Sequence, residues 1–246
     1  MAKYNIHAGH NAAGKAACGA VGLLNESTEA RRVKQYLLKY LRAAGNTVYD
    51  CTVNNASGVS ANLIQIVDKC NKHSVTLDIS VHFNSGAKDK KGNGKTTGFE
   101  CYVTENTGIK KEVGNRACKA MAQLGFTNRG VKVSNNLYVL NKTYSKAILF
   151  EICFVDDKDD YELYKKVGYK RIARVLAEAI VGDSITLEYK ALSTMNIRKS
   201  KSILSTKVGS IPKGSVVKGE LIGSWLKIPQ GYVKFYGEQK EYFEEV

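Results

Sequence analysis

Residues 75–83 read Val-Thr-Leu-Asp-Ile-Ser-Val-His-Phe. This nearly continuous apolar run is typical of a strand in the middle of a sheet that is covered on both faces. His82 stands near its carboxyl end, where the chain turns polar. The stretch therefore predicts a fold built around a buried sheet, with an imidazole at the end of a core strand.

Strands and helices alternate on both sides of this run. Apolar residues recur every second residue in some segments and every three or four residues in others, which separates strands from helices. Such alternation predicts an α/β protein, here a three-layer α/β/α fold with a twisted, mostly parallel sheet. The other predicted strands cover residues 3–8, 47–53, 99–103, 136–140 and 147–154; helices are predicted over 25–44, 61–71, 110–124 and part of 161–181, and an exposed lysine- and glycine-rich loop over 86–98.

The helix predicted over residues 25–44 matters because it carries a carboxylate at its entry. Val33, Leu37 and Leu41 recur at helical spacing. Ser27 or Thr28 is the expected cap at its start. This arrangement places the neighbouring Glu26 in the first turn.

The pattern changes after the last predicted helix. Beyond residue 192, short β-branched or aromatic runs are broken by Pro and Gly turns, as in Pro212–Gly214 and Pro229–Gly231. This predicts a small all-β domain. The expected organisation is therefore an α/β domain over residues 1–182, a linker over 183–191 and a β-domain over 192–246.

Composition excludes several classes of protein. The chain of 246 residues carries a net charge of +14, and a field of this sign attracts polyanions such as nucleic acid or an anionic cell wall. No RNP, zinc-finger or basic-zipper pattern is present, so we expect a basic surface without a dedicated nucleic-acid site. Six cysteines lack a Cys-x-x-Cys pair, which favours reduced thiols over a disulfide scaffold. No apolar stretch approaches the roughly 20 residues that span a bilayer, and the polar start lacks the apolar core of a secretory signal.

Two of the four histidines lie in positions suited to chemistry. His10 follows a predicted strand in a turn-rich loop, His82 ends the core strand, and Glu26 opens a helix between them. Two imidazoles and a carboxylate form a common zinc set that leaves a fourth position for water. Spacing alone leaves each histidine open between a metal ligand and an ordinary core or surface residue.

Four blocks of sequence resemble the type 3 family of zinc-dependent N-acetylmuramoyl-L-alanine amidases, which occur in phage endolysins and wall-remodelling enzymes. They are Ile6–His10, Gly22–Glu26, Asp78–Asn84 and Ala147–Phe154, in the family's order. The resemblance covers about residues 2–181. It departs from the family where His7-Ala8 replaces the usual Asp-Pro and where Cys153 replaces a common Gly.

The resemblance implies a role for each block. It implies Zn²⁺ as cofactor with His10, Glu26 and His82 as ligands, and Glu151 as the catalytic carboxylate. The bond cut in this family joins N-acetylmuramic acid to L-alanine. A zinc-bound water attacks the amide near neutral pH, and the Glu takes its proton and passes it to the leaving amine.

Other candidates carry weaker expectations. His7 is three residues from His10, which on a strand points it to the other face, so we interpret it as a supporting or structural residue. His73 is expected on the surface. Asn84 and Tyr138 are candidates for substrate contact, although a loop Asn is more often a turn residue.

The terminal β-domain resembles bacterial SH3-like wall-binding domains. The resemblance rests on Met195–Arg198, Val208–Gly214, Trp225–Ile228 and Gly231–Val233, in the family's order. Lys199-Ser200-Lys201 replaces the family's Gly-Pro-Ser, which leaves the ligand open. Its aromatic residues are interpreted as core or strand-face residues.

The expected protein is thus an endolysin-like amidase with peptidoglycan as its partner. We expect synthesis in the host cytoplasm without a signal peptide, no stable membrane insertion, and action on the wall after the membrane is opened. Three alternatives stay open: a zinc peptidase that cuts inside the stem peptide, a wall-binding protein without catalysis, and a basic nucleic-acid-binding protein. An internal start at Met195 would give the wall-binding domain alone.

Overall fold

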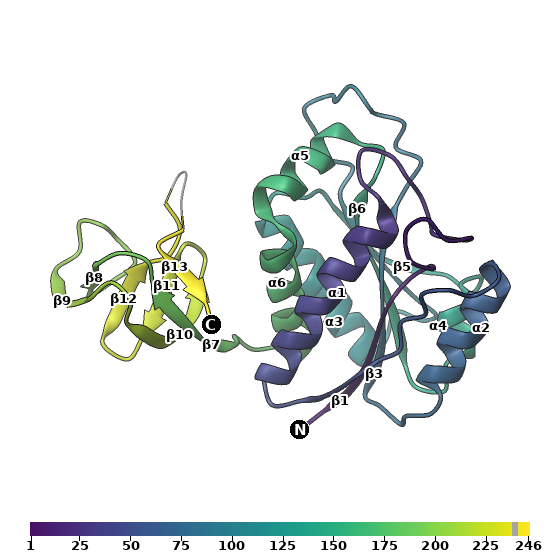
Figure 1. Ribbon diagram of the computed structural model, residues 1–246, viewed down its shortest axis with the longest axis horizontal. Helices are drawn as coiled ribbons and strands as arrows, with labels where there is room; N and C mark the ends of the chain where they lie inside the picture. Colours follow the sequence, from purple (N-terminus) through teal and green to yellow (C-terminus); the bar gives the residue numbers. More distant parts are fainter. Residues whose placement is uncertain (238–240) are drawn as a thin grey trace. The chain divides into compact units, whose positions relative to one another are not determined.

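The computed structural model describes residues 1–237 and 241–246, which form two compact units, Met1–Gly182 and Asp183–Val246. In the first unit, strands and helices alternate along the chain (Figure 1). Its strands are β1 (Lys3–Ala8), β2 (Thr47–Asp50), β3 (Leu77–Asn84), β4 (Phe99–Val103), β5 (Asn128–Val133) and β6 (Ala147–Phe154). Its helices are α1 (Glu26–Ala43), α2 (Val59–Cys70), α3 (Gly108–Gln123), α4 (Tyr138–Lys142), α5 (Lys158–Val167) and α6 (Tyr169–Val181).

The six strands form one sheet in the order β2-β1-β3-β6-β4-β5. Every neighbouring pair is parallel except β4 and β6. Helices α1, α3 and α6 pack together on one face, while α2 and α4 lie on the other (Figure 1). The predicted α/β fold with a mostly parallel sheet is confirmed.

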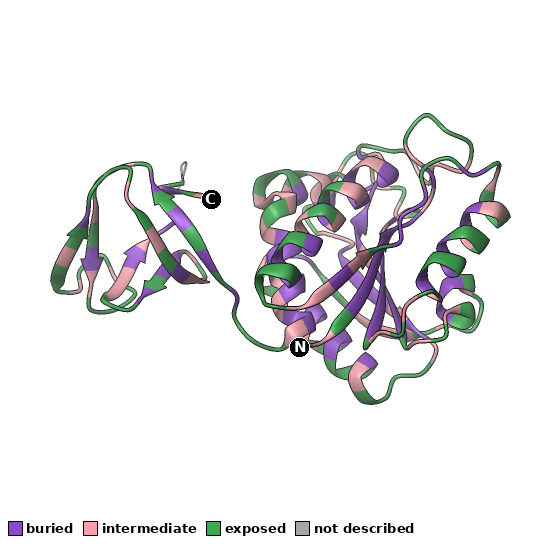
Figure 2. Ribbon diagram, turned by 60° about the horizontal axis from the view of Figure 1, so that its bottom comes forward, coloured by how far each residue is buried: buried purple, intermediate pink, exposed green. Residues whose placement is uncertain are grey.

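Strand β3 occupies the centre of the sheet, as its apolar sequence predicts. Leu77, Ile79 and Val81 are fully buried. The central strands run as buried ribbon through the first unit while the outer helix faces are exposed (Figure 2). A second group of buried side chains packs under α2 and α4 and includes Ile66, Val139 and Leu149. Burial on both faces holds the strand ends in fixed positions, which the site depends on.

Helix α1 begins at Glu26, before its expected cap. The Asn25 side chain accepts a hydrogen bond from the Thr28 amide at 3.0 Å, so Asn25 is the cap and the expectation of Ser27 or Thr28 was wrong. Ser27 instead donates its hydroxyl to the carbonyl of Asn11 at 2.5 Å. Asn is as good a cap as Ser because its side-chain oxygen reaches the same amide.

The segment 136–140 is not a strand. Helix α4 occupies Tyr138–Lys142, and the carbonyl of Leu137 accepts hydrogen bonds from the amides of Leu140 and Asn141. Val139 and Leu140 are both buried and share a core cluster with Ile66 and Val67 of α2. Packing against α2 therefore overrides the local β-propensity.

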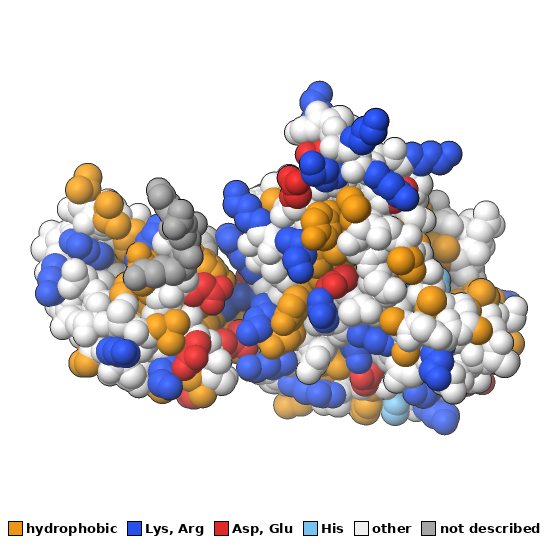
Figure 3. Space-filling model, turned by 45° about the horizontal axis from the view of Figure 1, so that its top comes forward, with side chains coloured by type: hydrophobic (Ala, Val, Ile, Leu, Met, Phe, Trp, Pro, Cys, Tyr) orange, Lys and Arg blue, Asp and Glu red, His pale blue; other side chains and the backbone are white. Residues whose placement is uncertain are grey.

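The loop between β3 and β4 is exposed and rich in lysine, as expected. The Asp156 carboxylate pins its start by accepting hydrogen bonds from the amides of Gly86 and Lys88 at 3.0 Å. The loop carries Lys88, Lys90, Lys91 and Lys95, and basic side chains gather on a projecting part of the first unit (Figure 3). It ends where the amide of Gly98 donates to Asp160.

The second unit is an all-antiparallel sheet of seven strands in the order β13-β7-β10-β11-β12-β8-β9. Trp225 and Phe235 are buried in it, as their interpretation as core residues requires. The strands are β7 (Thr186–Ala191), β8 (Met195–Arg198), β9 (Lys207–Ile211), β10 (Val216–Ile222), β11 (Trp225–Ile228), β12 (Gly231–Lys234) and β13 (Phe243–Glu245).

Strand β7 corrects two expectations. It occupies most of the segment 183–191 that the sequence suggested as a linker, and it pairs with both β10 and β13. Its alternating burial, with Leu187, Tyr189 and Ala191 inside, makes it part of the core of this unit. A chain started at Met195 would lack this strand, so the structure argues against a folded product from that start.

The described residues contain no helix long and apolar enough to cross a bilayer. All six cysteines are free thiols, and five of them are buried. Most of the thiols therefore lie in the core of the fold.

Candidate functional site

His10 leaves the end of β1 in a strained loop. Its backbone φ of 62° is left-handed, which costs a non-glycine residue about 1–2 kcal/mol. Arg31 of α1 holds the loop, because its Nη2 donates to the carbonyl oxygens of His10 and Val53 at 2.9 and 3.0 Å. The Ser27 hydroxyl bonded to Asn11 adds a second tie to α1. These bonds fix the point from which the His10 ring projects.

Glu26 is the first residue of α1, and the residue as a whole is only 4% exposed. Its Oε2 accepts from the Ala20 amide at 2.8 Å and its Oε1 accepts from the Phe83 amide at 3.2 Å. Burial alone would raise the pKa of this carboxyl, but hydrogen bonds with His10 and His82 outweigh burial and lower it. Glu26 is therefore held as a carboxylate between two rings.

His82 stands on β3 just before a register shift against β6. Gly9 lies under its ring, and an added methyl group at Gly9 would overlap the imidazole. The ring therefore rests directly on backbone. This close approach, and not a turn, is the reason that a glycine is needed before His10.

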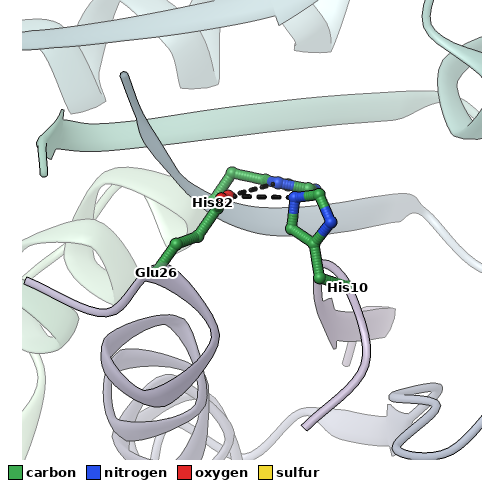
Figure 4. Close-up of side chains that lie close together, drawn as sticks. All are labelled: His10, Glu26 and His82. Atoms are coloured by element: carbon green, nitrogen blue, oxygen red, sulfur yellow. Dashed lines mark hydrogen bonds and ion pairs between the residues drawn. The ribbon is translucent and has the colours of Figure 1, made fainter. Parts of the chain in front are cut away.

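The three side chains meet at one point (Figure 4). Glu26 Oε1 lies 3.2 Å from His10 Nε2 and 2.9 Å from His82 Nδ1. One ligand atom from each residue lies within 4.8 Å of the others. A tetrahedral centre with bonds of about 2.0–2.2 Å separates its ligand atoms by roughly 3.3–3.6 Å. These separations are near those of a tetrahedral set, and two imidazole nitrogens with a carboxylate oxygen are donors that suit a divalent metal ion.

Glu151 faces this cluster from the neighbouring strand. It is in register with His82 across the parallel pair β3 and β6, so both side chains point to the same face of the sheet. Its Oε2 is buried and has no hydrogen-bond partner among the described residues. Burial, together with the negative charges of Glu26 and Glu100, raises the pKa of Glu151 well above its usual range. A buried, unsatisfied carboxyl is a costly feature that suits a functional site.

A cavity of about 610 Å³ opens beside these residues. Pockets of this size hold ligands of drug or dipeptide size. One wall is polar and contains the His-Glu-His cluster and Glu151, and the opposite wall is largely apolar. The second wall is built by Val59, Asn62, Leu63 and Ile66 of α2 and by Asn136, Leu137, Tyr138 and Val139 at α4.

The remaining candidates lie at different depths. His7 is buried and contributes to the cavity wall, and burial and the charge of His82 lower its pKa to about 3, so it is neutral. His73 lies away from the site and stacks on Tyr49 at 3.8 Å. Asn84 and Tyr138 both line the cavity. The Asn84 amide is not free, because its Nδ2 donates to Glu100 at 2.7 Å.

Sequence reasoning missed two supporting groups. Arg31 lies five residues after Glu26 and only the fold shows that it clamps the His10 loop. Glu100 is buried beside Glu151 in the register of β4 and β6, although an isolated Glu in a strand gives no signal of its own. A charged residue inside a predicted buried strand, with apolar neighbours on both sides, was the available hint.

Similarity to a known protein family lies in the first unit. A sequence profile of the family described as N-acetylmuramoyl-L-alanine amidase matches residues 5–181. The solved catalytic domain of the CD27L endolysin targeting Clostridia difficile is 28% identical with a TM-score of 0.65, and the match covers 74% of this chain and 98% of that one.

Two curated relatives are similar in sequence. An uncharacterised protein of Clostridium perfringens is 33% identical over 211 residues, 85% of this chain and 60% of that protein. The endolysin of Bacillus phage SPP1 is 32% identical over 120 residues, 46% of this chain and 41% of that protein. The chain therefore spans at most 60% of the length of these two relatives.

Proposed function

This chain belongs to the family of N-acetylmuramoyl-L-alanine amidases, and on that premise we propose that it hydrolyses the amide bond between N-acetylmuramic acid and L-alanine in peptidoglycan. The observation that carries the proposal is the meeting of His10, Glu26 and His82 beside the unpaired carboxyl of Glu151. The four come from the loop after β1, the start of helix α1, and strands β3 and β6. Such convergence is costly for a site without function.

His10, Glu26 and His82 would hold a Zn²⁺ ion. Their two nitrogens and one oxygen are the donors that catalytic zinc sites use with a position left for water. When bound, zinc supplies a Lewis acid that polarises an amide carbonyl and brings the pKa of water toward ~7. The Ala20 and Phe83 amides keep the Glu26 carboxylate oriented, which is the support that metal ligands require.

Glu151 would move the proton. It takes a proton from the attacking water as the water oxygen bonds to the lactyl carbonyl carbon, and it gives that proton to the amine of L-alanine as the C–N bond breaks. The products are a lactyl carboxylate and a peptide with a free amino terminus. Glu151 lines the cavity, and its Oε2 has no hydrogen-bond partner among the described residues, so this oxygen is not committed to another protein group.

We extend the proposal to the whole chain. The second unit would act as a wall-binding domain of SH3-like type, supported by its small antiparallel sheet. An endolysin-like role, in which the protein reaches the wall after the membrane is opened, is supported by similarity to the phage SPP1 endolysin.

End-group analysis of digested peptidoglycan tests the proposed reaction. We expect the purified chain to release new amino-terminal alanine without new reducing sugar. New amino groups on other residues would show a peptidase, and a susceptible wall without new ends would show a binding protein. Either of the last two results contradicts the proposal.

The Gly9→Ala substitution tests the proposed metal site by displacing the His82 ring, which lies against Gly9. The added methyl group overlaps the His82 ring, so the ring must turn away from Glu26. We expect roughly 10- to 100-fold weaker zinc binding in a competition titration with a chelating indicator. Gly58→Ala is the matched control, because its φ of 178° suits any residue and its added methyl meets open space. Equal affinity of Gly9→Ala and the control would show that His82 is not a ligand.

A further inference from the structure

A row of charged side chains crosses the sheet from the His-Glu-His cluster. His82 on β3 is in register with Glu151 on β6, and Glu151 is in register with Glu100 on β4. Registered residues on neighbouring strands point to the same face. Beyond Glu100, Arg129 and Lys132 of β5 complete the row.

Glu100 anchors the far end of this row. The residue is 1% exposed, and its Oε1 accepts hydrogen bonds from Asn84 Nδ2 at 2.7 Å and from the Tyr102 hydroxyl at 2.8 Å. Its Oε2 accepts from Arg129 Nε at 2.6 Å and from Lys132 Nζ. Each oxygen therefore accepts two hydrogen bonds. The carboxylate fixes two cations and, through Asn84, the wall of the cavity.

The two cations are not neutralised by their anchor. Arg129 and Lys132 carry two positive charges against the one negative charge of Glu100, and their side chains are 33% and 37% exposed. Arg129 uses Nε for Glu100, and its guanidinium carbon lies 5.0 Å from the centre of the Phe154 ring, so its two terminal nitrogens are not used by Glu100. A fork of this kind binds carboxylates in two-pronged fashion.

We propose that Arg129 and Lys132 form a subsite for a carboxylate on the leaving peptide, so that the site selects an acidic stem peptide. The inference rests on the proposed amidase function. Neighbouring strands lie about 4.8 Å apart, so β5 is roughly 10 Å from Glu151 on β6. An extended peptide advances about 3.3 Å per residue, and a chain that starts at the amine beside Glu151 reaches β5 at about its third residue.

A paired-substrate assay on the unmodified protein tests this subsite. One muramoyl peptide carries free carboxylates on its second and third residues, and the other carries the same residues as amides. We expect kcat/KM to favour the free carboxylates by roughly tenfold or more, as for a charge-assisted bond. Calorimetry with the released peptides should show the same preference in Kd. Equal values for the two peptides would overturn the proposal.

Variants then assign the preference to these residues. Arg129→Gln should bring the ratio between the two substrates toward one, while Lys132→Arg should keep it. Lys119→Gln removes a charge from the exposed face of α3 and should leave the ratio unchanged. The midpoint of thermal unfolding of each variant shows whether the fold is kept when the buried Glu100 loses a cation partner. A ratio that Arg129→Gln leaves intact in a folded protein would overturn the assignment, whereas failure to cut either substrate would overturn the amidase function itself.

Discussion

Replacing Glu151 by glutamine should lower kcat by about 100- to 10,000-fold while zinc binding stays within a few-fold of the unmodified chain. Glutamine has nearly the same size and shape but cannot accept and return a proton. Glu151 lies beside the three proposed ligands in register with His82, so its loss should not remove a ligand. The measurement is kcat on a soluble muramoyl peptide, together with the zinc content after dialysis.

Glu105→Gln is the matched control for this substitution. Its carboxylate is 64% exposed and pairs with Lys110 outside the cavity, so kcat should not change. Unchanged turnover in Glu151→Gln would show that another group carries the proton. Loss of zinc together with activity would instead assign Glu151 to the metal site.

Replacing His82 by alanine should abolish both activity and tight zinc binding. The substitution removes one of three donors and leaves Glu26 with one imidazole partner instead of two. We expect a loss in zinc affinity of more than about 100-fold and activity at the background of the assay. Binding to whole cell walls should persist, because the second unit is untouched.

His73→Ala serves as the control, since that ring stacks on Tyr49 away from the cluster. It should keep full zinc affinity and activity. An active His82→Ala protein would contradict the assignment of the ligand set. A protein that loses wall binding as well as activity would indicate general unfolding, which circular dichroism would show.

The sequence predicts the sheet well because its signals are local. The apolar run around Val81 needs no knowledge of its neighbours, and the position of Glu26 follows from the helix pattern after it. Local signals fail where packing decides. Leu140 belongs to a helix because α2 covers it, and Leu187 belongs to a strand because β10 and β13 lie on either side.

The site could be predicted only as far as its ligand types. Glu151 lies beside His82 because β3 pairs with β6. The two residues are 69 positions apart in the sequence, and no nearby residue indicates that their strands pair. The roles of Gly9 and Arg31 depend on contacts across the sheet and helix layers. Strand order is a property of the whole fold, so neither could be read from nearby residues.

We propose that a single zinc ion held by His10, Glu26 and His82 enables amide hydrolysis. Titration of Zn²⁺ into the metal-depleted chain of residues 1–246, with release of amino-terminal alanine from a muramoyl peptide as the readout, tests this directly. We expect no release without metal, a linear rise, and a break at one equivalent of zinc per chain. Full activity in the metal-depleted chain, or added zinc that restores no alanine release, would contradict it.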